Sequence, residues 1–254
     1  MDFNGLVDIM AKLRCESGCP WDKEQTERTL VPYLIEEAYE VIEAIDEGDP
    51  LKIKEELGDL LFQIVFLAQI AAEKGHFRIE DVIAAIGGKM VSRHPHVFGN
   101  AVYETAEEVL KQWGDRKKEE GKDSVLSGVP SSAPALLRAY RLQQRVSRVG
   151  FDWNKAEEVF DKFVEEVEEF RNALHSKSRE DIFDEMGDLF FTLVNVSRFI
   201  KVNPEDALRA TINKFATRFG YIEKKAKEQN RSLSDMTIEE MDKIWNEAKC
   251  SEAK

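Results

Sequence analysis

Two segments of the chain carry the same ordered pattern of carboxylates and apolar residues, and this repetition limits the folds that the chain can adopt. Residues 35–41 (IEEAYEV) correspond to residues 164–170 (VEEVEEF), and residues 56–62 (ELGDLLF) correspond to residues 185–191 (EMGDLFF). The interval from Glu40 to Glu56 equals the interval from Glu169 to Glu185. A tandem duplication explains this order better than chance does, so the chain is expected to contain two related units.

Both units are predicted to be helical. Apolar residues recur with helical spacing wherever the sequence is periodic, and no stretch shows the sustained alternation of a half-buried strand. We therefore predict an all-α fold of tandem helical bundles. The predicted helices are residues 4–15, 31–47, 51–74, 79–93, 106–119, 135–149, 156–176, 179–201, 204–229 and 237–249. His94-Pro95-His96 is interpreted as a loop after a helix stop.

The boundary between the two units is predicted from loop composition. Residues 121–134 contain Gly121, Gly128, Pro130, Ser131, Ser132 and Pro134. This is the only concentrated loop composition in the middle of the chain. We predict an N-terminal domain over residues 1–120, a linker over 121–134 and a C-terminal domain over 135–254.

The repeated carboxylates are the first candidate for chemistry. An EExxE segment followed by ExxD places four or five carboxylates on two helices which, with a short connection, should run antiparallel. Asp59 and Asp188 are each followed by a run of apolar residues, so their helices are apolar around most of the circumference and are predicted to be buried. Facing carboxylates in such a place need a cation or a raised pKa.

Oxygen ligands favour a hard divalent ion, and a metal shared with phosphate is expected to be Mg²⁺, for which Mn²⁺ is expected to substitute. A solvated acidic face is the simpler interpretation, and it fits the ExxD pairs poorly. A di-iron bundle ranks low, because it needs two Glu-x-x-His pairs and the chain offers only Glu73-Lys74-Gly75-His76.

Two pairs of basic residues recur downstream of the acidic motifs. Lys89 and Arg93 stand four residues apart, as do Lys214 and Arg218, so each pair shares a helix face. Such pairs are able to hold the non-reacting oxygens of a polyphosphate, although either pair alone also fits an ordinary exposed surface. Trp245 is a further candidate for substrate binding by stacking, and a packing role is the competing interpretation.

Charge and cysteine content limit the binding partners and the cellular location that we expect for the protein. The formal net charge of −13 argues against the broad electropositive surface that nucleic-acid or membrane binding requires, so neither partner is expected. The three cysteines form an odd set without a zinc-ligand pattern. Residues 1–14 lack the continuous apolar segment of a signal peptide. We therefore expect a cytoplasmic protein.

The ordered motifs resemble one known family. Glu36-Glu37-x-x-Glu40 with Glu56-x-x-Asp59, the CPWDKEQT run at residues 19–26 and RHPHVF at residues 93–98 together resemble the MazG-type nucleoside triphosphate pyrophosphohydrolases. The resemblance covers essentially the whole chain, including the tandem arrangement of long members.

The resemblance implies a metal-dependent hydrolase that cleaves nucleoside triphosphates between the α- and β-phosphates, releasing a nucleoside monophosphate and pyrophosphate, with broad base specificity. It also implies a homodimer, because one bundle alone leaves its site incomplete. The implied Mg²⁺ ligands are Glu37, Glu40, Glu56 and Asp59 in the first half and Glu166, Glu169, Glu185 and Asp188 in the second half. Glu36 and Glu165 are the candidates for orienting or deprotonating the attacking water.

Two alternatives remain open from the sequence. One is a narrow hydrolase of the all-α dUTPase or dCTPase type, which shares the metal chemistry. The other is a non-catalytic helical interaction module, whose acidic faces only confer solubility.

Overall fold

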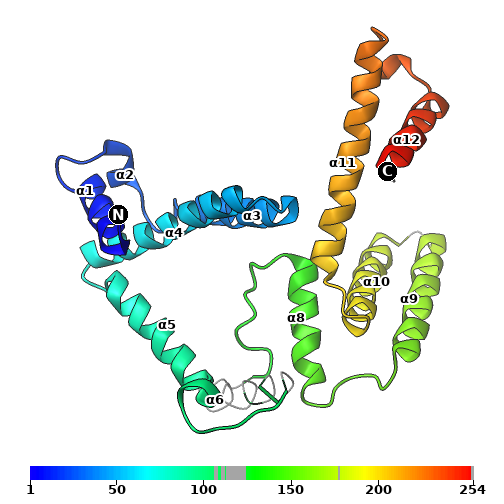
Figure 1. Cartoon of the computed structure of the whole chain (residues 1–254). Coiled ribbons are helices and arrows are strands. Elements are labelled where there is room, and N and C mark those ends of the chain that lie inside the picture. Colours follow the sequence, from blue (N-terminus) through cyan, green and yellow to red (C-terminus); the bar gives the residue numbers. More distant parts are fainter. Residues whose placement is uncertain (106–107, 110–111, 113–123, 177, 253–254) are drawn as a thin grey trace. The chain divides into compact units, whose positions relative to one another are not determined.

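The computed structural model of the chain is built from α-helices and a short 3₁₀ helix (Figure 1). It describes residues 1–105, 108, 109, 112, 124–176 and 178–252. No β-strand occurs within these described ranges, which confirms the all-α prediction. Among the same residues, no helix is long and apolar enough to cross a membrane.

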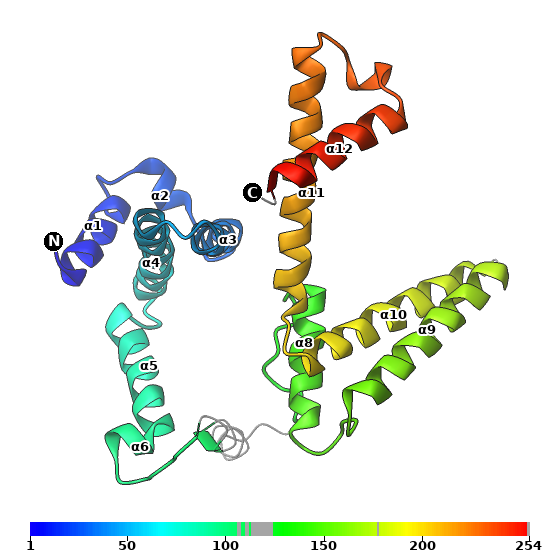
Figure 2. The same ribbon diagram turned by 45° about the vertical axis from the view of Figure 1, so that its right-hand side comes forward.

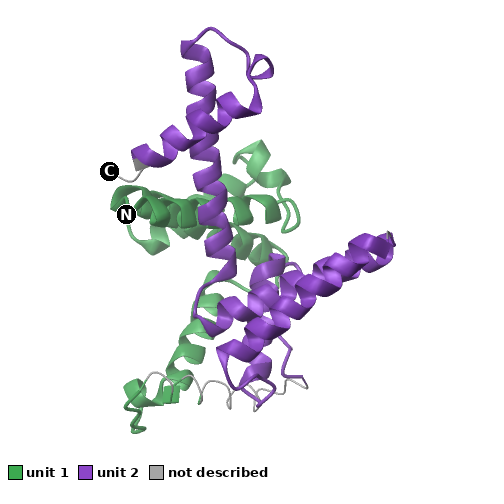
Figure 3. Cartoon of the chain, turned by 90° about the vertical axis from the view of Figure 1, so that its right-hand side faces the viewer, with its two compact units in different colours: residues 1–113 green, residues 114–254 purple. Residues whose placement is uncertain are grey.

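The chain divides into two compact units, residues 1–113 and residues 114–254 (Figure 3). The described part of the predicted linker, from residue 124 onward, belongs to the second unit. The predicted helix over residues 106–119 lies for the most part outside the described residues.

The helices of the first unit follow the predicted segments and include two short additions, α2 and α6. They are α1 (Phe3–Arg14), α2 (Pro20–Glu24), α3 (Val31–Glu47), α4 (Pro50–Glu73), α5 (Ile79–Arg93) and α6 (Pro95–Phe98). The helix stop expected at His94 is present, and the interpretation as a loop was wrong for Pro95 and His96, which begin α6. Proline is well tolerated in the first turn of a helix, and both added helices begin at one.

Helices α3 and α4 form an antiparallel hairpin because of the short turn between them. Gly48 takes a left-handed conformation with φ of +71°, and its amide donates to the carbonyl oxygens of Ala44 and Ile45 at 3.1 Å. The Asp49 carboxylate accepts from the Leu51 amide at 2.9 Å, and Pro50 begins α4. The turn therefore brings the acidic segment of α3 alongside the acidic segment of α4.

The core of the first unit lies where α1 crosses the second half of α4. It consists of the buried side chains Met10, Leu30, Val65, Phe66 and Ile70. Arg14 closes this end of the unit: its guanidinium pairs with Glu73 at 2.7 Å and lies over the Phe66 ring. Burial thus concentrates at the end of α4 that is remote from the acidic residues.

The second unit contains a second long hairpin and a further helix pair. Its helices are α8 (Ala135–Ser147), α9 (Ala156–Ser176), α10 (Arg179–Phe199), α11 (Pro204–Glu228), the 3₁₀ helix (Leu233–Asp235) and α12 (Ile238–Glu252). Helix α9 packs along α10, and α11 packs along α12, as both Figure 1 and Figure 2 show. The Gln143 side chain of α8 donates to the Phe191 carbonyl oxygen of α10 at 2.8 Å.

Both hairpins leave one apolar face uncovered within their own unit. Leu61 is 37% exposed and Phe190, its counterpart in the repeat, is 53% exposed. The same holds for Ile35 with Val164 and for Ile64 with Leu193. The prediction that these helices are buried is therefore wrong for this face of each hairpin in a single chain, although other residues of α4 and α10 are buried. Apolar composition shows that a face favours burial without showing what covers it.

We predict that Phe66→Ala lowers the free energy of unfolding by about 3–5 kcal/mol, because it leaves a cavity beneath Met10 and Arg14. Phe66 is 1% exposed, whereas Val102 in the same unit is 81% exposed. Urea unfolding followed by circular dichroism measures both changes, and Val102→Ala is the control, with an effect within about 0.5 kcal/mol. Equal effects of the two substitutions would show that Phe66 is not a core residue.

Candidate active site

The first hairpin gathers three carboxylates from two helices. Glu37 on α3 and Glu56 and Asp59 on α4 each offer an oxygen, and these atoms lie within 4.8 Å of one another. Glu37 and Glu56 are half-buried, and Asp59 is exposed. We call these three residues the first cluster.

The carboxylates of the first cluster oppose one another electrostatically. Burial raises the pKa of Glu37, and its contact with Glu40 and the charge of Asp59 raise that pKa further. The Gln63 amide donates to Glu37 Oε1 at 3.3 Å and acts in the opposite direction. Burial, followed by repulsion from Glu40, also raises the pKa of Glu56. Glu40 thus adds to the negative potential without joining the group of three oxygens.

The second hairpin repeats the arrangement. Glu166 on α9 and Glu185 and Asp188 on α10 bring three oxygens within 4.8 Å of one another, and Glu166 is buried. Burial raises the pKa of Glu185, and the charges of Glu169, Glu166 and Asp188 add to the effect. We call these three residues the second cluster, at whose edge Glu169 stands as Glu40 stands beside the first.

Lys162 lies against the second cluster and was not among the residues singled out from the sequence. Its ammonium group is 2.8 Å from Glu165, 2.9 Å from Glu166 and 3.9 Å from Glu169. These partners stand three, four and seven residues further along the same helix face, so helical spacing was the signal that pointed to Lys162.

The donor set of both clusters fits a hard divalent cation. Carboxylate oxygens converge from two helices, and their mutual repulsion is relieved when a positive charge lies between them. Glu36 and Glu165, each next in sequence to a cluster member, are exposed on the first helix of their hairpin. In that place they are accessible to solvent.

The basic pairs lie on other helices. Lys89 and Arg93 are on α5, which continues from the far end of α4 towards α6 (Figure 1). Lys214 and Arg218 are on α11, which packs against α12. The structure thus assembles each carboxylate group within one hairpin and places the basic residues on separate helices of the same unit.

Arg218 and Trp245 are brought together where α11 meets α12. The Arg218 guanidinium lies 5.5 Å from the centroid of the Trp245 ring. The Trp245 ring also contacts the Phe215 ring, with 5.3 Å between their centroids, and Trp245 is half-buried. The tryptophan therefore packs in the helix pair and still presents part of its surface.

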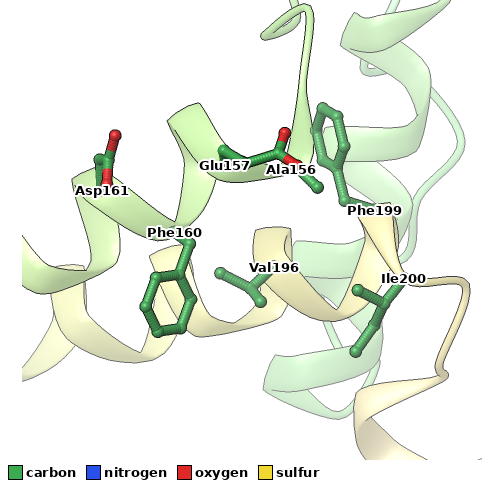
Figure 4. A pocket seen from close by; sticks show the side chains of 7 residues that line it. All are labelled: Ala156, Glu157, Phe160, Asp161, Val196, Phe199 and Ile200. Carbon is green, nitrogen blue, oxygen red and sulfur yellow. The ribbon is translucent and has the colours of Figure 1, made fainter.

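A shallow apolar hollow of about 350 Å³ lies between the start of α9 and the end of α10 (Figure 4). The residues that line it are Ala156, Glu157, Phe160, Asp161, Val196, Phe199 and Ile200. None of the candidate site residues is among them, so the hollow is separate from the second cluster.

A known protein family matches both of the repeated hairpins. The model of the MazG nucleotide pyrophosphohydrolase domain matches the chain over residues 25–98 and again over residues 155–221. Each match contains one carboxylate cluster.

Similarity to individual proteins extends over almost the whole chain. The nucleoside triphosphate pyrophosphohydrolase/pyrophosphatase MazG of Thermotoga maritima is 46% identical over 250 residues, which are 97% of this chain and 95% of that protein. The nucleoside triphosphate pyrophosphohydrolase of Escherichia coli K12 is 42% identical over 97% of both chains. The uncharacterised protein YabN of Bacillus subtilis is 46% identical over 99% of this chain, which spans 52% of that longer protein. These matches confirm the resemblance inferred from the motifs, and the chain belongs to the family of the MazG nucleotide pyrophosphohydrolase domain, of which it carries two copies.

Proposed function

We propose that this protein hydrolyses nucleoside triphosphates between the α- and β-phosphates, with Mg²⁺ held by the carboxylate clusters, and releases a nucleoside monophosphate and pyrophosphate. The observation that carries the proposal is the convergence of three carboxylates on each of two hairpins. The names of the relatives from Thermotoga maritima and Escherichia coli support the same activity.

Different carboxylates have different roles in the proposed reaction. Glu37, Glu56 and Asp59, and likewise Glu166, Glu185 and Asp188, would hold the ion. Glu40 and Glu169, on the first helix of each hairpin, would complete the two sets of ligands. When bound, Mg²⁺ supplies charge neutralisation at the phosphate oxygens. Glu36 and Glu165 are exposed carboxylates beside the clusters, where they accept a proton from the attacking water.

The basic and aromatic side chains bind the rest of the substrate. Lys89 with Arg93, and Lys214 with Arg218, hold the non-reacting phosphate oxygens as charge-assisted donors. Trp245 offers a partly exposed ring beside Arg218, and stacking on a ring tolerates any base. We therefore propose broad base specificity.

Product analysis on a panel of ribo- and deoxynucleoside triphosphates tests the activity. Wild type with Mg²⁺ is expected to give monophosphate and pyrophosphate, and chelation of the metal is expected to abolish both. Asp59→Asn and Asp188→Asn each remove one ligand charge, so the hairpin that carries turnover is expected to lose on the order of 100-fold in rate, the size of one lost electrostatic contact.

The outcome also separates the competing activities. A diphosphate product, or no turnover with any nucleotide, contradicts the proposal and favours a non-catalytic helical module. Turnover restricted to a single pyrimidine nucleotide shows a narrow hydrolase instead. The exposed carboxylate Asp46 on the same helix as Glu37 provides a control, since Asp46→Asn is expected to leave the rate near that of wild type.

The raised pKa values of Glu37, Glu56 and Glu185 predict how metal binding depends on pH. A carboxyl whose pKa is higher in the folded protein than in the unfolded chain destabilises the fold above its folded pKa, and the penalty disappears as the pH falls below the unfolded pKa. Protons and the metal compete for the same oxygens. The increase in Tm on adding Mg²⁺ is therefore expected to be larger at about pH 7.5 than at about pH 5.

Differential scanning fluorimetry of the wild type with and without Mg²⁺ measures that difference. An equal shift at both pH values contradicts binding at the clusters. Without metal, the same measurement should also show that acidification removes the part of the destabilisation that comes from the ionised cluster carboxylates.

We further propose that the protein is a homodimer in which the uncovered faces of the hairpins pack against a second copy. Equivalent positions are exposed in both repeats, as Leu61 and Phe190 show, and large apolar faces on a hairpin favour burial in an interface. The carboxylates lie on the same two helices as these faces, so dimerisation also brings a second copy's helices to the site.

Light scattering coupled to size exclusion tests the dimer. Leu61→Glu and Phe190→Glu each place a charge in an apolar face and are expected to shift the dimer towards monomer, with the larger effect identifying the hairpin that carries the interface. Val102→Glu makes the same change at a residue that is 81% exposed and serves as the control. A monomeric wild type, or dimers unaffected by both substitutions, contradicts the proposal.

We propose the cytoplasm as the location of the protein. Cys15, Cys19 and Cys250 are free thiols, and reduced thiols are typical of the cytosol.

A further inference from the structure

The two clusters differ in the side chain that contacts their most buried glutamate. In the first cluster, Glu37 accepts a hydrogen bond from the neutral Gln63 amide of α4 at 3.3 Å. In the second cluster, Glu166 pairs with the Lys162 ammonium group of its own helix at 2.9 Å. The repeats therefore carry the same carboxylates in different electrostatic surroundings.

The difference comes from one position of the repeat. Four residues before Glu166 stands Lys162, and four residues before Glu37 stands Tyr33. The Tyr33 ring packs edge-on against Trp21, with 5.8 Å between the ring centroids. Among the residues that the structure describes, no ion pair shorter than 4.0 Å joins a lysine or arginine to Glu36, Glu37 or Glu40.

Lys162 places a positive charge against one member of the second cluster, Glu166, and against two carboxylates beside it. Its ammonium group reaches Glu165, Glu166 and Glu169, which are the candidate water-activating residue and two candidate metal ligands. The hydrogen bonds that the Lys162 ammonium group donates to Glu165 and Glu166 raise the pKa of Lys162.

The burial of Glu166 distinguishes its contact with Lys162 from an ordinary ion pair on a helix surface. The Glu166 side chain is 8% exposed, whereas Lys162 is 34% exposed. Attraction between opposite charges strengthens as the surroundings become less polar. The Lys162 stem is partly exposed and flexible, so its ammonium group is able to move into solvent when a metal ion binds Glu166.

We infer that Lys162 neutralises Glu166 in the metal-free protein and competes with the metal ion for that carboxylate. This inference rests on the proposed metal role of the cluster. Metal entry requires the ammonium group to leave Glu166 and Glu169, and the same movement releases Glu165. The second cluster therefore binds metal more weakly than it would without Lys162, whereas in the first cluster no lysine or arginine among the described residues pairs with Glu37.

Binding of Mn²⁺ to the full-length protein without nucleotide tests the inference, with free Mn²⁺ measured by electron paramagnetic resonance. The second cluster is isolated in an Asp59→Asn background, and the first in an Asp188→Asn background. In the Asp59→Asn background, Lys162→Met is expected to lower the Kd for Mn²⁺ by at least about threefold. That factor corresponds to the free energy of one partly exposed ion pair.

The reciprocal substitution places the competitor in the first cluster. In the Asp188→Asn background, Tyr33→Lys is expected to raise the Kd for Mn²⁺ by a similar factor. Lys162→Arg keeps the charge and should retain weak binding. Arg171→Met removes the charge of an exposed ion pair with Glu168 on the same helix, away from the cluster, and should leave the Kd unchanged.

Unchanged or weaker Mn²⁺ binding by Lys162→Met overturns the inference. An equal effect of Arg171→Met also overturns it, because the cause is then the general charge of the helix. If circular dichroism shows that Lys162→Met does not fold, the test depends on Tyr33→Lys alone. An unchanged Kd for Mn²⁺ in that variant contradicts the inferred competition. The proposed hydrolysis fails separately, through the absence of monophosphate and pyrophosphate from the wild type.

Discussion

Repulsion between facing carboxylates is the constraint on which the rest of this structure depends. A hairpin of two helices closes through Gly48 and Asp49, and the packing of α1 on the far half of α4 fixes the pair at its other end. The turn and this packing therefore keep the acidic segments of α3 and α4 side by side. Their burial and mutual charge raise the pKa of Glu37, Glu56 and Glu185, and each hairpin needs a compensating group.

The two repeats meet this requirement differently. An amide from the facing helix serves the first cluster, and an ammonium group from the same helix serves the second. A duplicated unit thus keeps its ligands while its surroundings diverge. We expect such divergence to separate the two copies in metal affinity before it separates them in fold, because neither Gln63 nor Lys162 belongs to the apolar core of its unit.

Much of the architecture was predictable because helices repeat every 3.6 residues. The hairpins, their antiparallel course and the meeting of residues 37, 56 and 59 follow from the periodicity and from the short turn at Gly48. The short helices α2 and α6 were missed, since four or five residues carry no period. The exposure of Leu61 and Phe190 was also missed, because composition does not reveal which surface covers a face. Contacts of a single side chain, such as that of Lys162, become visible only when each carboxylate is compared with the residues one turn away.

A crystal structure of the full chain with Mn²⁺ and a non-hydrolysable triphosphate analogue is the most direct test of the account, because anomalous scattering locates the metal. The account predicts Mn²⁺ between Glu37, Glu56 and Asp59 and between Glu166, Glu185 and Asp188, with the Lys162 ammonium group withdrawn from Glu166. Metal bound elsewhere, or clusters that remain empty while nucleotide is bound, would contradict it.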